Sequence, residues 1–326
     1  MILALETSCD DTCAALVGLD GTVLANVISS QEVHDRFGGV VPEIAARHHL
    51  ELIDAVVGEA FARAGVAVEQ VSLVAATRGP GLIGALLVGF CAAKGFAAAR
   101  ELPFAPIDHL EGHIAAAYLA PARFEPPFLA LIASGGHTLL LDVSERGGAV
   151  EVLARTLDDA AGEAFDKGAR MLGLGYPGGP ALSRLAAGGD PDSYDFPTGR
   201  SADFSFAGLK TALLYKTREV DASDPQVRAN LAAAYQRAIV DALVRRVLHG
   251  LERSGRTRLA LGGGVAANTA LRARLETLGV ELFLPAPELC TDNAAMIAAA
   301  ALDSGALRYP DYLELDVYAT GEGPLR

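Results

Sequence analysis

The sequence is poor in the features of secreted, disulfide-stabilised proteins. Its 326 residues include no tryptophan and four cysteines, none of them in a CxxC pair. If the segment is extended, Cys9 and Cys13 lie roughly 13 Å apart, which is too far for a disulfide. We therefore expect a reduced, cytoplasmic enzyme.

Signals for membrane insertion are missing as well. The N-terminus starts directly in an apolar strand pattern, without the basic and apolar regions of a signal peptide. The longest apolar run, Leu82–Ala93, is shorter than the about 20 residues that span a bilayer. No membrane partner is expected.

Basic charge is scarce. Lys and Arg total 27 against 40 Asp and Glu, which gives a net charge of −13. This balance argues against generic coating of nucleic acid, which needs an excess of basic charge. A local basic patch, or a partner that supplies one, remains compatible with the sequence.

The chain does have enough apolar residues for a large core. Hydrophobic residues make up 51% of the sequence and charged residues 21%, which argues against disorder. A chain of this length is expected to form about two domains.

The segment Leu129–Thr138 indicates how these domains are related, because Leu3–Thr12 repeats it. When the two segments are aligned, Leu, Ala, Leu, Ser and Thr coincide, and at the same offset Gly21 falls on Gly147. Each copy reads as an apolar strand, a turn of small residues, a second strand, a glycine turn and a third strand. The separation is far too long for a solenoid repeat. We predict two duplicated lobes; the alternative is two ordinary hairpins that share hairpin chemistry.

The elements predicted after each copy occur in a similar order. The predicted strands are Ile2–Thr7, Cys13–Leu19, Thr22–Ser29, Leu73–Thr77, Phe104–Ile107, Phe128–Ala133, Thr138–Val143, Val150–Thr156, Arg258–Leu261 and Val280–Leu284. The predicted helices are Pro42–Ala64, Leu82–Arg100, His109–Leu119, Gly162–Leu172, Pro225–Ser254, Val265–Leu278 and Asp292–Ser304. Residues 173–180 are expected to form a loop, and residues 190–206 an irregular insertion.

In each of the two lobes, three antiparallel-type strands are followed by alternating strands and helices. This order indicates an α/β fold with mixed sheets. By analogy this is the actin-like ATPase fold of sugar kinases and chaperone ATPases, in which a nucleotide sits in an interlobe cleft. The first lobe is expected to comprise residues 1–126 plus about 291–326, and the second residues 127–290.

A pair of histidines, His109 and His113, has the spacing that places both rings on one face of a helix, where they could hold one metal ion. Glu111 would point about 200° away, so this is not a metalloprotease HExxH helix. Asp292 is the best candidate for a third ligand. His and carboxylate ligands with open positions suit Fe²⁺ or Zn²⁺ as a Lewis acid. The pair alone is weak evidence, because solvated histidines on a helix are common.

Glycine-rich turns are the candidate sites for a phosphate or a nucleotide. In Ser134–Thr138 the glycines allow the backbone to approach a ligand closely. The strand–loop–helix segment Gly262–Asn268 suits a phosphate, or an adenosine stacked above it, although a plain connection is the alternative. Asp166 lies on a predicted helix, where an aspartate is most often simply solvated, and Gly178-Gly179 follow in the next loop.

The first copy of the repeat carries two carboxylates, Asp10 and Asp11, in its turn. They could act as a general base or hold a metal-bound phosphate, and turn capping is the alternative. We expect His34 and His249 on the surface. The basic residues between Arg245 and Arg258 are expected to form a solvated helix end rather than an RNA platform.

Taken together, these segments resemble the tRNA threonylcarbamoyladenosine transferase family, TsaD, formerly described as O-sialoglycoprotein endopeptidases. The matching segments follow one another along nearly the whole chain: Glu6–Thr12, Gly38–Glu43, Gly79–Leu82, His109–Ile114, Ala133–Thr138, Gly162–Lys167, Tyr176–Pro180, Asp203–Lys210, Gly262–Asn268 and Cys290–Asn293.

The resemblance implies an acyltransferase of tRNA modification. It would transfer a threonylcarbamoyl group from threonylcarbamoyl-adenylate to the exocyclic amine of the adenosine beside the anticodon in tRNAs that read ANN codons, releasing AMP. By the same resemblance His109, His113 and Asp292 would bind one divalent metal, Fe²⁺ before Zn²⁺. The residues that would hold the adenylate are Ala133, Ser134, Gly135, Gly136, His137, Asp166, Gly179 and Asn268.

Two positions depart from the family pattern. Ser183 stands where many relatives have an Asp, which puts one ribose contact in doubt. Asp11 replaces a frequent Glu and shortens a candidate base by one methylene; Asp10 is the other candidate for that role.

The resemblance also implies partners. The tRNA is the substrate, and a TsaB-like paralogue and a TsaE-like small ATPase would assist, which fits an acidic chain that is poorly suited to grip tRNA alone. The isolated chain could form a homodimer. Two rival functions stay open at this point: an actin-like ATPase or small-molecule kinase, which has no use for the histidine pair, and an ATP-binding scaffold.

Overall fold

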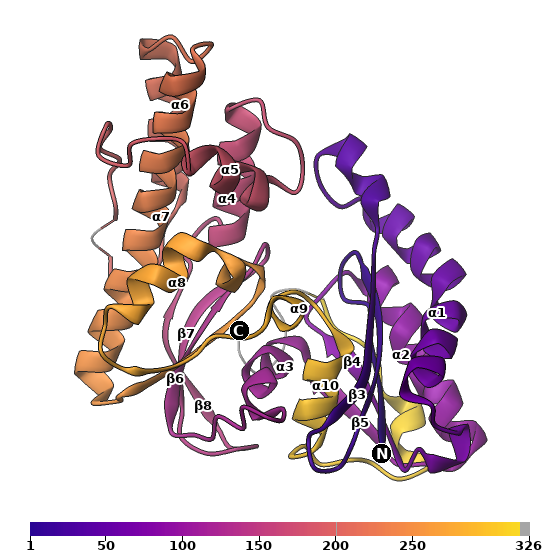
Figure 1. The fold of residues 1–326 in the computed structure, drawn as a ribbon. Coiled ribbons are helices and arrows are strands. Elements are labelled where there is room, and N and C mark those ends of the chain that lie inside the picture. The colour runs from indigo at the N-terminus through magenta and orange to yellow at the C-terminus, as the bar shows by residue number, and fades with distance from the viewer. Residues whose placement is uncertain (200, 320–326) are drawn as a thin grey trace. The chain divides into compact units, whose positions relative to one another are not determined.

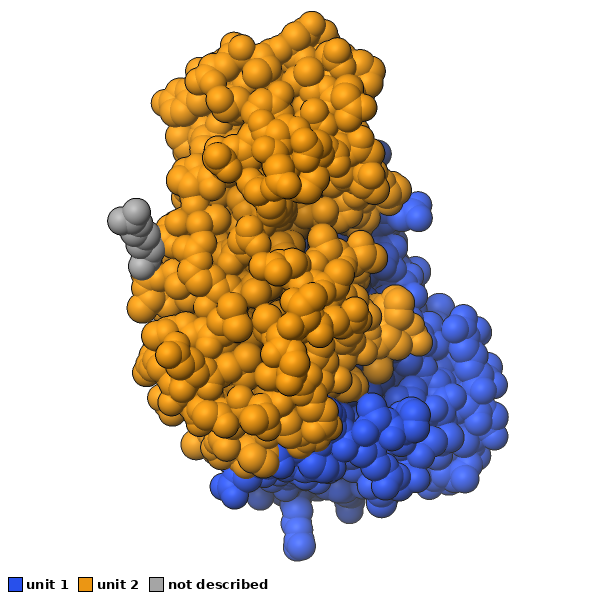
Figure 2. All heavy atoms as spheres, turned by 60° about the vertical axis from the view of Figure 1, so that its left-hand side comes forward, with its two compact units in different colours: residues 1–126, 145–148, 291–326 blue, residues 127–144, 149–290 orange. Residues whose placement is uncertain are grey.

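The computed structural model describes residues 1–199 and 201–319, which form two compact units (Figure 2). Unit 1 contains Met1–Pro126, the short segment Glu145–Gly148 and the C-terminal segment that begins at Thr291. Unit 2 contains Pro127–Ser144 and Ala149–Cys290.

Each unit is built on one mixed sheet of five strands (Figure 1). The strand order is β3-β2-β1-β4-β5 in unit 1 and β10-β9-β6-β7-β8 in unit 2. The strands β1 to β5 are Ile2–Glu6, Asp11–Val17, Val23–Ser30, Leu73–Gly79 and Phe104–Asp108. The strands β6 to β10 are Phe128–Ala133, Thr138–Val143, Val150–Arg155, Arg258–Gly262 and Glu281–Phe283.

The two sheets share topology and register. The central strands β1 and β6 each pair antiparallel with the next strand and parallel with a later one. Leu3 lies opposite Leu16 in unit 1, and Leu129 lies opposite Asp142 in unit 2. These are the positions that the sequence repeat aligns. The predicted α/β fold with duplicated mixed sheets is therefore confirmed.

The central strands also explain where the core sits. Every residue of β1 and of β6 is buried, as expected for a strand that has helices on both faces of its sheet. Their runs of Leu, Ile and Ala supply the apolar surface. Glu6, the last residue of β1, is an exception, since it is a carboxylate with no exposed surface.

The helices cover both sheets. The helices α1 to α10 are Pro42–Ala64, Ile83–Ala99, His109–Ala115, Ala161–Met171, Gly178–Ala186, Ala207–Glu219, Pro225–Ser254, Thr269–Glu276, Pro287–Cys290 and Ala294–Ala301. In unit 1, α1 and α2 pack together and on the sheet, while α10 packs on β1 and β2 and against α3 (Figure 1). In unit 2, α7 packs against α4, α5, α6 and α8. No helix in the described part of the chain is long and apolar enough to cross a membrane.

The structure departs from the sequence prediction at α5 and α6. The loop expected at 173–180 ends in α5, because the Asp166 carboxylate accepts hydrogen bonds from the amides of Gly178 and Gly179 at 2.8 and 3.2 Å. The unpredicted helix α6 starts where Asp158 accepts hydrogen bonds from the amides of Phe206 and Ala207. Both capping carboxylates come from residues far away in the sequence, so the sequence around each helix start contains no N-terminal capping signal.

Three predicted helices differ from the observed ones by more than one residue at an end. The helix predicted from His109 ends at Ala115, and a 3₁₀ turn follows before the chain becomes extended at Leu119, ahead of Pro121. The helix predicted at 265–278 is divided by Asn268, whose side chain accepts the Leu271 amide at 2.9 Å and starts α8. The last helix begins at Ala294 because Asn293 is its N-cap, so Asp292 precedes it.

One surface prediction is wrong. His34 is fully buried, because its ring is hydrogen-bonded to Gln31 and to the amide of Val41. His249 is exposed, as predicted.

Candidate functional site

The strand β5 leads directly into α3, which carries the two histidines of the predicted metal site. Asp108 lies at the junction, and its carboxylate caps the helix by accepting the amides of Leu110 at 2.8 Å and Glu111 at 3.3 Å. This cap fixes the start of α3, and the helical period then brings His109 and His113 to the same face. Their ring centroids are 4.8 Å apart.

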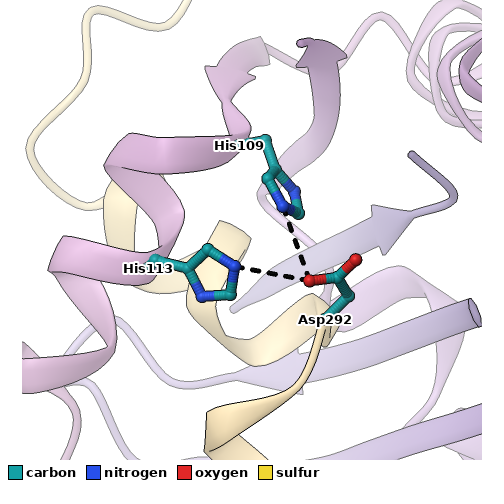
Figure 3. Close-up of side chains that lie close together, drawn as sticks. All are labelled: His109, His113 and Asp292. Carbon is teal, nitrogen blue, oxygen red and sulfur yellow. Dashed lines mark ion pairs between the residues drawn. The ribbon is translucent and has the colours of Figure 1, made fainter. Parts of the chain in front are cut away.

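Asp292 joins the two histidines, as Figure 3 shows. Its Oδ1 atom lies 3.5 Å from Nε2 of His109 and 3.3 Å from Nε2 of His113. Possible ligand atoms of the three residues all lie within 4.8 Å of one another. Both histidines are buried, and Asp292 is partly exposed. The structure of unit 1 therefore brings together the three residues that the sequence analysis selected.

Glu6, which is not among the residues predicted from the sequence, orients His109. The Glu6 Oε2 atom accepts a hydrogen bond from His109 Nδ1 at 2.9 Å, and the Glu6 carboxylate also accepts from the Ser8 amide and the Thr77 hydroxyl. Because Glu6 holds a proton on Nδ1, Nε2 is the ring nitrogen that faces Asp292. The available signal was a carboxylate inside an otherwise apolar buried strand, where an unpaired charge is not tolerated.

The charges of the cluster favour a cation. Burial opposes protonation of His109, but the carboxylates of Asp292 and Glu6 outweigh it and raise the pKa of His109 to about 9. Neither ring nitrogen of His113 forms a hydrogen bond within the described chain, although Asp292 is close to Nε2. A buried polar group left unpaired costs about 1–3 kcal/mol, so such a group calls for a bound partner. Two imidazole nitrogens and a carboxylate fit a divalent transition metal.

The candidate bases lie in the same unit. Asp10 is in the turn between β1 and β2, and Asp11 is the first residue of β2. Burial, followed by repulsion from the Asp292 carboxylate, raises the pKa of Asp11 to about 7. Burial also raises the pKa of Asp10. The structure therefore places both carboxylates close enough to Asp292 to interact with it.

Among the predicted substrate residues of unit 2, Ala133 ends β6, and Ser134 to His137 form the turn between β6 and β7. The Ser134 amide donates to the His137 carbonyl at 2.8 Å, and the Ser134 carbonyl accepts from the Gly162 amide at 3.0 Å. Gly135 and Gly136 are exposed. A Cβ atom on Gly162 would lie 2.7 Å from the Ser134 carbonyl, and one on Gly263 would lie 2.4 Å from the Ala133 oxygen. Two glycines thus let the start of α4 and the end of β9 approach this turn.

The other predicted substrate residues fall into two hydrogen-bonded groups. Asp166 and Gly179 are joined at the start of α5. Asn268 donates from Nδ2 to Ser183 Oγ at 2.8 Å and to Gln236 Oε1 at 2.9 Å, and Ser183 donates to the same Gln236 oxygen at 2.6 Å. Gln236 was not predicted, because it lies in the middle of the long helix α7 with no motif around it.

A cavity of about 460 Å³ lies beside this second group, between α5, α7 and α8. Gln236, Arg237, Asp241 and Arg274 supply its polar lining. None of the predicted substrate residues lines it. Gln236 connects the cavity to Asn268 and Ser183.

Known proteins match the chain over most of its length. The TsaD family profile, described as tRNA N6-adenosine threonylcarbamoyltransferase, matches residues 22–299. The chain belongs to the TsaD family. A tRNA N6-adenosine threonylcarbamoyltransferase of Symbiobacterium thermophilum is 50% identical over 308 residues, which cover 92% of this chain and 90% of that protein. One from Anaeromyxobacter sp. is 50% identical over 309 residues, covering 92% of each.

Membership of the TsaD family identifies the chain as a transferase of tRNA modification, and the kinase and scaffold alternatives are not favoured. A solved structure supports the fold. Component A of the Acidaminococcus fermentans (R)-2-hydroxyglutaryl-CoA dehydratase superposes with a TM-score of 0.58 at 16% identity, covering 93% of this chain and 96% of that one. This likeness and the two mixed sheets confirm the predicted actin-like ATPase fold class.

Proposed function

We propose that the chain transfers the threonylcarbamoyl group of threonylcarbamoyl-adenylate to the exocyclic amine of the adenosine beside the anticodon in tRNAs that read ANN codons. AMP is the leaving group. The names of the relatives supply the transferred group and the tRNA. The single structural observation that supports the proposal is the cluster of the buried His109 and His113 with the partly exposed Asp292 in unit 1.

The metal is proposed to be one divalent cation held by His109, His113 and Asp292. Three protein ligands of N and O type suit Fe²⁺, with Zn²⁺ as the alternative. When bound, such an ion supplies Lewis-acid polarisation of a carbonyl oxygen. Glu6 holds the proton of His109 on Nδ1 and thereby keeps Nε2 directed at the site.

The adenylate is proposed to bind to unit 2. The exposed backbone of Gly135 and Gly136 donates hydrogen bonds to its phosphate, beside the N-terminus of α4, where the helix dipole favours an anion. Asp166 and Gly179 hold the sugar on one side. Asn268, kept in place by Ser183 and Gln236, recognises the adenosine.

An aryl-type amine is a weak nucleophile, so the reaction benefits from a base. Asp11 fills this role, with Asp10 as the alternative. A pKa of about 7 suits Asp11 for accepting a proton at neutral pH.

The chain is proposed to work in the cytoplasm in a complex. A net charge of −13 repels the phosphates of tRNA, so a TsaB-like paralogue and a TsaE-like ATPase are the proposed assistants that bring substrate and enzyme together.

The test is to incubate purified chain, with and without such partners, with tRNA and threonylcarbamoyl-adenylate, to digest the tRNA, and to measure the modified nucleoside. Wild type should form it, and His113→Ala should not. His249→Ala, which changes an exposed histidine, is the matched control. Unchanged modification by His113→Ala would remove the cluster from the mechanism, and phosphoryl transfer without modification would favour a kinase.

A further inference from the structure

Unit 1 contains a second group of buried polar side chains, which the proposed reaction does not use. Thr12, Gln31, His34 and His49 are each at most 6% exposed. They come from β2, from the end of β3 and the 3₁₀ turn after it, and from α1. Their hydrogen bonds form one connected chain.

At one end of this hydrogen-bond network, the backbone fixes which group donates and which accepts. The Val41 amide lies 3.3 Å from His34 Nδ1 and is able only to donate, so Nδ1 accepts. The neutral ring of His34 then carries its proton on Nε2. That proton is donated to Gln31 Oε1 at 3.0 Å.

The side-chain amide of Gln31 continues the network to α1, again as the donor. Its Nε2 atom donates to the Ala45 carbonyl and to His49 Nδ1, both at 3.3 Å. The Thr12 hydroxyl also donates to His49 Nδ1, at 2.8 Å. With Nδ1 accepting, the proton of His49 is on Nε2 and is donated to the Cys9 carbonyl at 3.0 Å.

The donor at one end of the network and the acceptor at the other end are fixed independently, and they are compatible. The network starts at the Val41 amide, which is able only to donate, and it ends at the Cys9 carbonyl, which is able only to accept. The donors of Gln31 and Thr12 share the single lone pair of His49 Nδ1, and this arrangement holds with both histidines neutral. Burial also lowers the pKa of His49, which favours the neutral ring.

The network holds the turn that presents the candidate bases. His49 donates to the carbonyl of Cys9, and the backbone amide of Gln31 donates to the carbonyl of Asp10 at 3.2 Å. These consecutive carbonyls precede Asp11. We propose that His49 is a positioning residue: through Cys9, and together with Gln31 and His34, it fixes the backbone that aims Asp10 and Asp11. The inference rests on the proposed function to the extent that one of these carboxylates is the base.

The kinetic test compares two substitutions. His49→Phe keeps a ring but removes the hydrogen bonds of both ring nitrogens. His49→Gln keeps a side-chain amide that is able to donate to the Cys9 carbonyl. His49→Phe should lower kcat about 10- to 100-fold, the effect of misplacing a catalytic group by about 1 Å. The KM for threonylcarbamoyl-adenylate should change less than about twofold, because its proposed contacts lie in unit 2. His49→Gln should recover most of kcat.

His48→Gln is the matched control, since it changes the neighbouring histidine of α1, which takes no part in the network. Far-ultraviolet circular dichroism establishes that each variant is folded. A folded His49→Phe protein with wild-type kcat, or one in which only KM changes, would overturn the proposal. So would a His49→Gln protein as slow as His49→Phe.

A second measurement does not depend on activity. Imidazole ¹⁵N resonances of the wild-type chain, assigned with His34→Asn and His49→Gln, should show the Nε2–H tautomer for both histidines at neutral pH. A proton on Nδ1 of either ring, or a charged ring at His49, would overturn the proposal. If wild type modifies no tRNA, the proposed function fails, while the tautomers still decide whether the network exists.

Discussion

Glu6→Gln is the change that most sharply tests how the candidate metal site is built. In the native structure Oε1 accepts from the Ser8 amide, and Oε2 accepts from the Thr77 hydroxyl and from His109 Nδ1. An amide at this position has one oxygen and one NH₂ group. Whichever way it is turned, the NH₂ group meets a donor, either the Ser8 amide or the His109 ring.

The expected losses of stability and of metal affinity follow from that conflict. One buried donor left unpaired costs about 1–3 kcal/mol of stability. If His109 moves its proton to Nε2 to relieve the conflict, the lone pair leaves the metal site. Loss of a carboxylate that orients a metal-bound histidine typically lowers metal affinity about 10- to 100-fold.

The assay is a competition titration of Fe²⁺ and of Zn²⁺ against a chromophoric chelator, with thermal unfolding of the metal-free protein alongside. Glu43→Gln is the matched control, because Glu43 forms only an exposed ion pair with Arg47. A Glu6→Gln protein with the metal affinity and stability of wild type would show that Glu6 does not orient His109 for the metal.

Two further changes test other parts of the structure. The pKa of Asp11 is raised from 3.8 to about 7, so its ionisation opposes folding as pH rises through this range, by about 4 kcal/mol once complete. The metal-free Asp11→Asn protein should therefore be more stable than wild type, and its gain in urea-unfolding free energy should be larger at pH 8 than at pH 5. An equal gain at both pH values counts against burial as the cause. Gly263 has φ +84° and no room for a Cβ atom beside Ala133, so Gly263→Ala should lower the melting temperature by several degrees, whereas Gly279→Ala, also at positive φ but with open space, should lower it less.

Much of the fold could be predicted from the sequence, for reasons visible in particular segments. The repeat of Leu3–Thr12 at Leu129–Thr138 fixes two sheets with one topology, because the same pattern of apolar residues and turns specifies the same register. The spacing of His109 and His113 likewise fixes their common face once a helix forms.

Other features depend on contacts between distant residues. Asp158 and Asp166 cap helices that begin many residues later in the sequence. The local sequence therefore contains no N-terminal signal for α6, and the first residues of α5 have the composition of a loop. His34 is polar and adjoins a glycine turn, which suggests exposure, but the partners that permit its burial are Gln31 and Val41. The link between Glu6 and His109 joins a strand to a helix and follows only from the packed unit.

The most direct test of the account is a metal titration of the metal-free chain in the complete tRNA-modification assay, with bound metal and modified nucleoside measured in the same samples. We expect the rate to rise in proportion to bound metal, up to one ion per chain, and we expect Asp292→Ala to bind little metal and to modify little tRNA. Full-rate modification by the metal-free chain would contradict it.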